Sequence, residues 1–160
     1  MAPYRRRMRQ NVRVAAYAVC VRDGRILLAR WTGAGGPRRW TLPGGGMEHG
    51  EDPYGTVVRE VEEETGYQVE PVALLGVESA RRVIPRRGWR RGPVDHQAVR
   101  VMYEVRVVGG ELRSEIDGST DLAAWHALSE VGALERVPYV DTALRLWHDR
   151  PPTGRVAGSP

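Results

Sequence analysis

The sequence predicts a mixed α/β (α+β) fold in which strands outnumber helices. Short apolar runs with strand-like alternation recur along the chain, and two longer segments have helical periodicity. Loops and turns, rather than regular helices, separate the strands, which argues against a doubly wound parallel sheet. The 160 residues, of which 41% are hydrophobic and 7% aromatic, have the size and composition of one globular domain.

The domain is expected over residues 11–150, without an internal repeat or a dividing linker. Residues 1–10, MAPYRRRMRQ, are expected to form a flexible basic arm. Residues 151–160, PPTGRVAGSP, are expected to form a disordered tail because proline, glycine and polar residues dominate them.

The first half of the domain is expected to be mainly β-structure. The segment 13–31, RVAAYAVCVRDGRILLARW, divides into two strands at Asp23-Gly24, a turn signal between apolar runs. A loop, GAGGPRR, precedes a short strand at 40–45, WTLPGG, which ends in glycines. A helix is then expected from Pro53 to Thr65, because proline suits a first turn and Gly66 provides a stop.

The second half alternates strands with loops and ends in a helix. A strand within 70–83 leads into an arginine-rich loop at 81–91, and 97–108 forms a strand that ends at Gly109-Gly110. A short strand at 121–128 is followed by a helical turn at 129–134. The last helix, 140–150, places one apolar stripe on its surface: Val140, Ala143, Leu144 and Trp147.

The net charge of +4 comes entirely from arginine, since lysine is absent. A GC-rich genome explains this bias, and attraction of phosphate-bearing ligands is the functional alternative. No apolar run reaches the roughly 20 residues that span a bilayer, and no signal-peptide segment follows the N-terminus, so a cytoplasmic location is expected. The single cysteine, Cys20, is expected to be buried and inert.

Three glutamates mark one side of the predicted helix. Glu60, Glu63 and Glu64 stand at helical positions i, i+3 and i+4, beside an apolar stripe that contains Val57 and Val61. Carboxylate oxygens gathered in this way are hard ligands of the kind that Mg²⁺ or Mn²⁺ prefers. The alternative is an acidic, solvated helix face, which is the commoner fate of a charge run.

The surrounding residues favour the metal-binding interpretation. The stretch 45–67 fits the pattern G-x5-E-x7-R-E-U-x-E-E-x-G-U, in which U is a bulky apolar residue. Its fixed positions are filled by Gly45, Glu51, Arg59, Glu60, Glu63, Glu64 and Gly66, while Tyr67 is a mild departure at the last U. This pattern resembles the box of the Nudix hydrolase family, and the resemblance extends over roughly residues 12–147.

The resemblance implies an α/β/α sandwich around a mixed sheet. It also implies Mg²⁺- or Mn²⁺-dependent hydrolysis of a nucleoside diphosphate linked to another moiety, such as a nucleoside triphosphate, ADP-ribose or a nucleotide sugar. By position, Glu60, Glu63, Glu64 and the Gly45 carbonyl resemble the metal ligands. Glu51 resembles the loop glutamate that binds metal through water or helps to orient the helix. Arg59 resembles the arginine that fixes the carboxylates by charge-assisted hydrogen bonds, with a structural ion pair as the alternative. The glycines that allow close approach of substrate are Gly44, Gly45 and Gly46.

The proton acceptor varies among Nudix enzymes and stays open here. Within the box, Glu64 and Glu60 are available. The acidic candidates outside it are Glu104, Glu115, Asp117 and Asp121.

The substrate is not specified by the markers that usually lie outside the box. Arg82 and His96 are candidates for substrate binding, although a solvated arginine-rich loop 81–91 and a structural histidine are the alternatives. Trp40 and Trp125 are expected in the core. RNA 5′-pyrophosphohydrolases tend to have glutamine where Gly44 follows Pro43 here, so nucleic acid is not the expected partner. Homodimerisation is expected by analogy alone.

Three functions follow. The expected one is a metal-dependent pyrophosphohydrolase of small nucleotides, because the box is complete. The alternatives are a non-catalytic Nudix-type nucleotide sensor and an RNA-directed pyrophosphohydrolase, in which the basic segments would follow a phosphate backbone.

Overall fold

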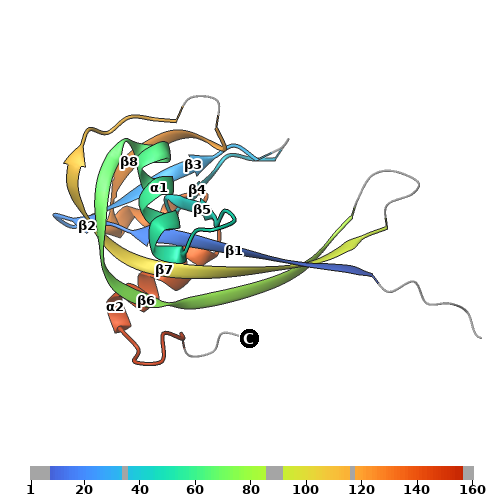
Figure 1. Cartoon of the computed structure of the whole chain (residues 1–160). Coiled ribbons are helices and arrows are strands. Elements are labelled where there is room, and N and C mark those ends of the chain that lie inside the picture. The colour runs from blue at the N-terminus through green and yellow to red at the C-terminus, as the bar shows by residue number, and fades with distance from the viewer. Residues whose placement is uncertain (1–7, 34–35, 86–91, 116–117, 157–160) are drawn as a thin grey trace, which may run out of the picture.

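The computed structural model describes residues 8–33, 36–85, 92–115 and 118–156. Its larger sheet has the strand order β5-β1-β7-β6 (Figure 1). β1 and β7 run parallel, whereas β1 with β5 and β6 with β7 run antiparallel, so the sheet is mixed, as predicted. The bounds are β1 Arg9–Val19, β5 Gly44–Gly46, β6 Tyr67–Ile84 and β7 Val94–Gly110.

The second sheet is antiparallel and is built on β3, which pairs with β2, β4 and β8. Its bounds are β2 Val21–Arg22, β3 Arg25–Trp31, β4 Arg39–Thr41 and β8 Thr120–Ala127. The predicted turn at Asp23-Gly24 is confirmed: φ is 51° and 72° at the two residues, as a two-residue hairpin loop requires. This turn joins β2 to β3, so the first predicted strand is divided after Val19.

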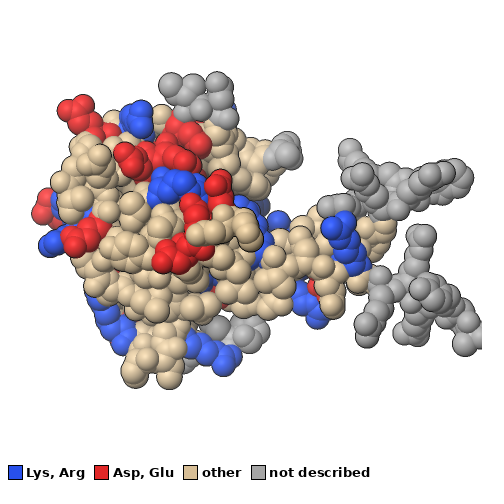
Figure 2. Space-filling model, viewed as in Figure 1, with Lys and Arg blue, Asp and Glu red and all other residues tan. Residues whose placement is uncertain are grey.

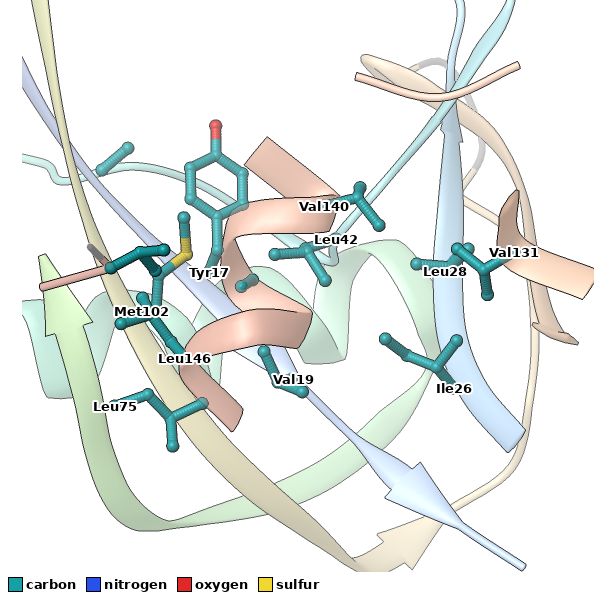
Figure 3. Packing of buried hydrophobic residues seen from close by; sticks show 13 residues of the cluster. Tyr17, Val19, Ile26, Leu28, Leu42, Leu75, Met102, Val131, Val140 and Leu146 are labelled. Carbon is teal, nitrogen blue, oxygen red and sulfur yellow. The ribbon is translucent and has the colours of Figure 1, made fainter. Parts of the chain in front are cut away.

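Two helices cover opposite faces of β1. Because side chains alternate along a strand, Ala16, Ala18 and Cys20 pack with α1 (Pro53–Thr65). Ala15, Tyr17 and Val19 belong instead to the cluster that contains α2, Tyr139–Asp149 (Figure 3). The predicted sandwich is thereby confirmed. A 3₁₀ helix, η1 (Leu128–Ala133), stands where a helical turn was predicted.

Several core predictions are confirmed as well. Cys20 is buried, and desolvation raises the pKa of its thiol to about 11. Trp40 and Trp125 are partly buried and pack against the two core clusters. In α2, Val140 and Ala143 are buried as predicted, whereas Leu144 and Trp147 only pack at the edge of the cluster, and the third buried position is Leu146, which was not predicted.

Three strand segments project from the body as a long ribbon (Figure 1). We define the ribbon as residues 9–13 of β1, 78–84 of β6 and 94–100 of β7. The expected flexible arm is wrong for Arg9 and Gln10, which pair in parallel with Val94 and Asp95 of β7. The expected loop at 81–91 is wrong for its first residues, since 81–84 pair with 94–97, and 86–91 lie outside the described residues.

The expected disordered tail is wrong for residues 151–156. Val156 is buried in the core, and the Val77 amide donates to the Gly154 carbonyl at 3.1 Å. Gly154 and Gly76 approach so closely that a Cβ on Gly76 would lie 2.1 Å from the Gly154 oxygen. Residues 157–160 lie outside the described part of the chain.

Among the described residues, no helix has the length and apolar character needed to cross a bilayer. The expected homodimer and cytoplasmic location stay predictions.

Candidate active site

Helix α1 presents its glutamates along the edge of a buried interface. The Asp52 side chain caps the helix by accepting the Gly55 amide at 2.7 Å, Pro53 occupies the first turn, and Gly66 ends it with φ 76°. Val57 and Val61 are fully buried against the sheet. The predicted helix boundaries are confirmed. Figure 2 shows acidic side chains gathered over the α1 region around basic ones.

Arg59 holds three of the carboxylates. Its Nε donates to Glu51 Oε1 at 2.6 Å, and its Nη1 donates to Glu60 and Glu63 at 3.1 and 3.2 Å. Its Nη2 donates to Glu51 Oε2 at 2.9 Å and to the Gly46 carbonyl at 3.2 Å. The Arg59 guanidinium, followed by the Glu48 amide, lowers the pKa of Glu51 to about 2. Glu51 is therefore ionised at neutral pH, and this network fixes the loop to the helix.

Glu64 lies in a different environment. Its side chain is buried, and Oε2 accepts the Gly44 amide at 2.9 Å. Desolvation raises its pKa to about 8, against the lowering effect of the Gly44 amide, and the charges of Glu60, Glu115 and Glu63 raise it further. Without a cation, Glu64 is therefore mostly protonated at neutral pH.

Glu60 lies directly beside the glycine strand β5. A Cβ on Gly45 would lie 2.6 Å from the Glu60 carboxyl carbon, so only glycine leaves this space open. Burial raises the pKa of Glu60, and Arg59 partly offsets this effect. Gly44 has φ 143°, and a Cβ there would lie 2.2 Å from the Ala16 carbonyl oxygen.

The carboxylates of the site are chemically suited to bind a divalent cation, but their side chains do not converge on a common point. Within the described ranges, no three His, Cys, Asp or Glu side chains form a group that could hold a metal ion as they stand. Glu60 and Glu63 contact Arg59, which compensates the repulsion between their carboxylates. The donors fit Mg²⁺ or Mn²⁺: they are all oxygens, and the missing Cβ of Gly45 leaves room beside Glu60. Their assignment as ligands stays a prediction.

The acidic residues outside the box are placed very differently. Asp121 pairs with Arg30 at 2.8 Å, and Glu104 pairs with Arg150 at 2.7 Å and accepts the Trp147 indole N–H. Glu115 lies close enough to Glu64 for its charge to raise the pKa of that residue. Asp117 lies outside the described residues.

A cleft of about 360 Å³ opens beside Glu64. Gly44 and Gly45 line it, and so do Arg82 and His96, the two residues predicted to contact substrate. Sequence reasoning missed other lining residues, namely Arg13, Tyr17, Trp31, Arg39, Arg100 and Tyr139. A larger, open groove of about 990 Å³ runs between β6, α2 and residues 151–156, but none of the box residues lines it.

A carboxylate edge beside an arginine-lined cleft is an arrangement typical of an enzyme that acts on phosphate groups through a divalent cation. Residues 9–147 match the family model described as the NUDIX domain. The chain therefore belongs to the Nudix family.

Individual proteins of the family resemble the chain over most of its length. It is 30% identical over 131 residues to putative nudix hydrolase 1 of Caenorhabditis elegans, a match that covers 79% of this chain and 32% of that protein. The chain thus spans about a third of that relative. It is 32% identical over 128 residues to an RNA pyrophosphohydrolase of Saccharophagus degradans, covering 73% and 74% of the two chains. The crystal structure of a MutT NUDIX hydrolase from Burkholderia pseudomallei is 29% identical, with a TM-score of 0.69 and coverage of 85% and 98%.

Proposed function

We propose that the chain is a metal-dependent pyrophosphohydrolase that cleaves a nucleoside diphosphate linked to another moiety by attack of water on phosphorus. The observation that supports it is the position of Glu64, Gly44 and Gly45. They line one end of a cleft whose other lining residues include arginines, so an anionic substrate can enter against the carboxylate edge.

The residues that would hold Mg²⁺ or Mn²⁺ are Glu60, Glu63, Glu64 and the Gly45 carbonyl. When bound, the cation neutralises the diphosphate and acidifies water. Arg59 and Glu51 would orient the carboxylates, and the hydrogen bonds of Arg59 with Glu51, Glu60 and Glu63 support this role.

The chain's own part in the reaction is to place the diphosphate and to accept a proton. The oxygen of water bonds to phosphorus, the phosphoanhydride P–O bond breaks, and the leaving phosphate departs with the bridging oxygen. The water proton passes to a carboxylate at this end of the cleft, for which Glu60, Glu64 and Glu115 are the candidates.

Product analysis over a panel of substrates tests this function. The purified protein is incubated with nucleoside triphosphates, ADP-ribose, nucleotide sugars and dinucleoside polyphosphates, with Mg²⁺, Mn²⁺ or EDTA. We expect metal-dependent release of a nucleoside monophosphate, and we expect Glu63→Gln to abolish it. Turnover that persists in Glu63→Gln contradicts the metal assignment. Absence of turnover together with thermal stabilisation by a nucleotide identifies a sensor.

An RNA-directed pyrophosphohydrolase is the second candidate. Its support is the 32% identical relative named RNA pyrophosphohydrolase, together with the cleft, which continues along the ribbon through Arg82 and His96.

A further inference from the structure

The ribbon separates its charges between its two faces. Directly paired residues share a face, so the register places Arg13, Ala98 and Ala80 together, and Asn11, His96 and Arg82 in the next row outward. All of these except Asn11 line the cleft beside Glu64. By the same alternation, Arg9 lies on this face near the outer end of the ribbon.

The opposite face carries no comparable surplus of positive charge. Its exposed residues include Val12 and Val83. Its arginine, Arg81, forms two hydrogen bonds of 2.6 Å with the buried Asp95 and is therefore neutralised. An arginine-rich genome predicts arginines on both faces alike and does not explain this separation.

The arginines of the cleft face differ in how far their charges are compensated. Arg100 is compensated by Glu78 at 2.7 Å, and its guanidinium lies 4.3 Å from the centre of the Tyr139 ring. By contrast, within the described ranges neither Arg9 nor Arg82 has a carboxylate oxygen within 4.0 Å. Glu64 is the one acidic residue among the described residues that line the cleft.

The arginines follow one another outward from the catalytic end. Arg13 lies beside Gly46, where a Cβ would be 2.7 Å from its Nη2. Successive rows on one face are two residues apart, which is roughly 6.6 Å, so the rows from Ala15–Arg100 to Arg9 extend for roughly 20 Å. This length exceeds what a triphosphate group occupies, and it suits a chain of regularly spaced phosphates.

An aromatic residue completes the surface. Trp31 lines the cleft, 42% of its surface is exposed, and its ring lies against Gly33, where a Cβ would be 2.3 Å from the indole. A basic track combined with an exposed aromatic ring is the arrangement by which proteins bind single-stranded nucleic acid.

We propose that the cleft face of the ribbon binds the phosphodiester backbone of a single-stranded nucleic acid whose 5′ phosphoanhydride enters the cleft at Glu64. This inference rests on the proposed function and names its substrate class. The proposal departs from the expectation, drawn from Gly44, that nucleic acid is not the partner. The separation of charge between the two faces of the ribbon depends on strand pairing, which the sequence alone does not reveal.

The test separates binding from turnover. A fluorescent 5′-monophosphorylated oligoribonucleotide is titrated at several salt concentrations against the wild type and Arg9→Gln/Arg82→Gln. Arg106→Gln is the matched control, because Arg106 pairs with Glu70 and does not line the cleft. We expect the double variant to bind about tenfold more weakly or worse, and its slope of log affinity against log salt to shrink by about 0.7 per arginine removed. Arg106→Gln should resemble the wild type.

Turnover gives the second readout. We expect kcat/KM to be at least about tenfold higher for a 5′-triphosphorylated oligoribonucleotide than for the free nucleoside triphosphate, and the double variant to reduce this preference. Equal kcat/KM values, or salt-dependent binding that is the same in the double variant and the wild type, overturn the inference. Because binding is measured without hydrolysis, absence of turnover on every substrate refutes the proposed function alone. Thermal melting checks that the variants fold. If the double variant does not fold, the two single variants, Arg9→Gln and Arg82→Gln, are measured in its place.

Discussion

The Nε of Arg59 lies 2.6 Å from Oε1 of Glu51, and this pair fastens the loop before α1 to the middle of the helix. Glu51 also accepts hydrogen bonds from the Glu48 amide and the Thr56 hydroxyl, both at 2.9 Å. Its carboxylate therefore binds donors from three different residues. The rest of the Arg59 fork reaches Glu60 and Glu63. One arginine therefore sets the positions of two proposed metal ligands.

We expect Arg59→Lys to reduce kcat by about tenfold or more, as loss of outer-shell partners of metal ligands usually does. Lysine keeps the charge but has no planar fork, so it cannot contact Glu51, Glu60 and Glu63 together. The measurement is kcat against Mg²⁺ concentration. Arg106→Lys, at an exposed pair with Glu70, provides the control. Unchanged kcat and Mg²⁺ dependence in Arg59→Lys would contradict a positioning role for the fork.

Substitutions at two neighbouring glycines are predicted to have different effects, one on stability and the other on activity. Gly44→Ala should lower the free energy of unfolding by roughly 2 kcal/mol or more, because φ is 143° and the new Cβ would meet the Ala16 backbone oxygen. At Gly45 the new Cβ meets the Glu60 carboxyl group, which is the end of a flexible side chain and can move. Gly45→Ala should therefore keep its stability and lose activity.

Denaturant unfolding and metal-dependent hydrolysis, measured on both glycine variants, check this contrast. Loss of stability in Gly45→Ala equal to that in Gly44→Ala would show that the space beside Glu60 serves the fold rather than the site.

Local sequence signals were sufficient to predict α1. Pro53, the valine stripe and Gly66 all act within a few residues, so the helix boundaries could be predicted. The box residues Glu51 and Arg59 are eight positions apart, which is also local. The strand turn at Asp23-Gly24 belongs to the same class of signal.

Apart from Arg82 and His96, the substrate side of the site could not be predicted, and neither could the way these two meet, because distant strands build it. Arg13 faces Ala98 through a parallel pairing of β1 with β7, and Arg82 faces His96 across an antiparallel one. Nothing in the alternation of a single strand selects its partner or register. The ordering of residues 151–156 was missed for the same reason, since it depends on Gly76 and Val77 far away in the chain.

Stability of the metal-free protein should fall as pH rises through the neutral range. The folded state holds a proton on Glu64 up to a pKa of about 8, whereas the ordinary pKa of a glutamate is 4.5. Between these values the folded state binds more protons than the unfolded state, so the free energy of unfolding decreases with rising pH, by roughly 3 kcal/mol between about pH 5 and pH 8. Glu60, whose pKa is also raised, acts in the same direction.

Glu64→Gln isolates this effect. Glutamine keeps an oxygen that can accept the Gly44 amide but carries no charge, so the variant should be more stable than the wild type near pH 8 in EDTA and similar near pH 5. His126, whose pKa burial lowers, contributes with the opposite sign in both proteins and cancels in the difference. Chemical unfolding at several pH values in EDTA measures this difference. If the free energy of unfolding changed with pH in the same way in the wild type and in Glu64→Gln, this result would contradict the burial of a protonated Glu64.

Glu115 is predicted to take part in proton transfer. Its Oε2 accepts the Thr120 amide at 3.2 Å and the Thr120 hydroxyl at 3.0 Å, and Thr120 lines the cleft. Glu104, by contrast, is occupied by Arg150 and Trp147. We expect Glu115→Gln to lower kcat by about a hundredfold, typical of a lost general base, and to remove the acidic limb of the pH profile of kcat. Glu104→Gln, matched in chemistry, should keep both. A full pH profile for each variant decides between the sites: if Glu115→Gln retains the acidic limb, the proton acceptor lies within the box, at Glu60 or Glu64.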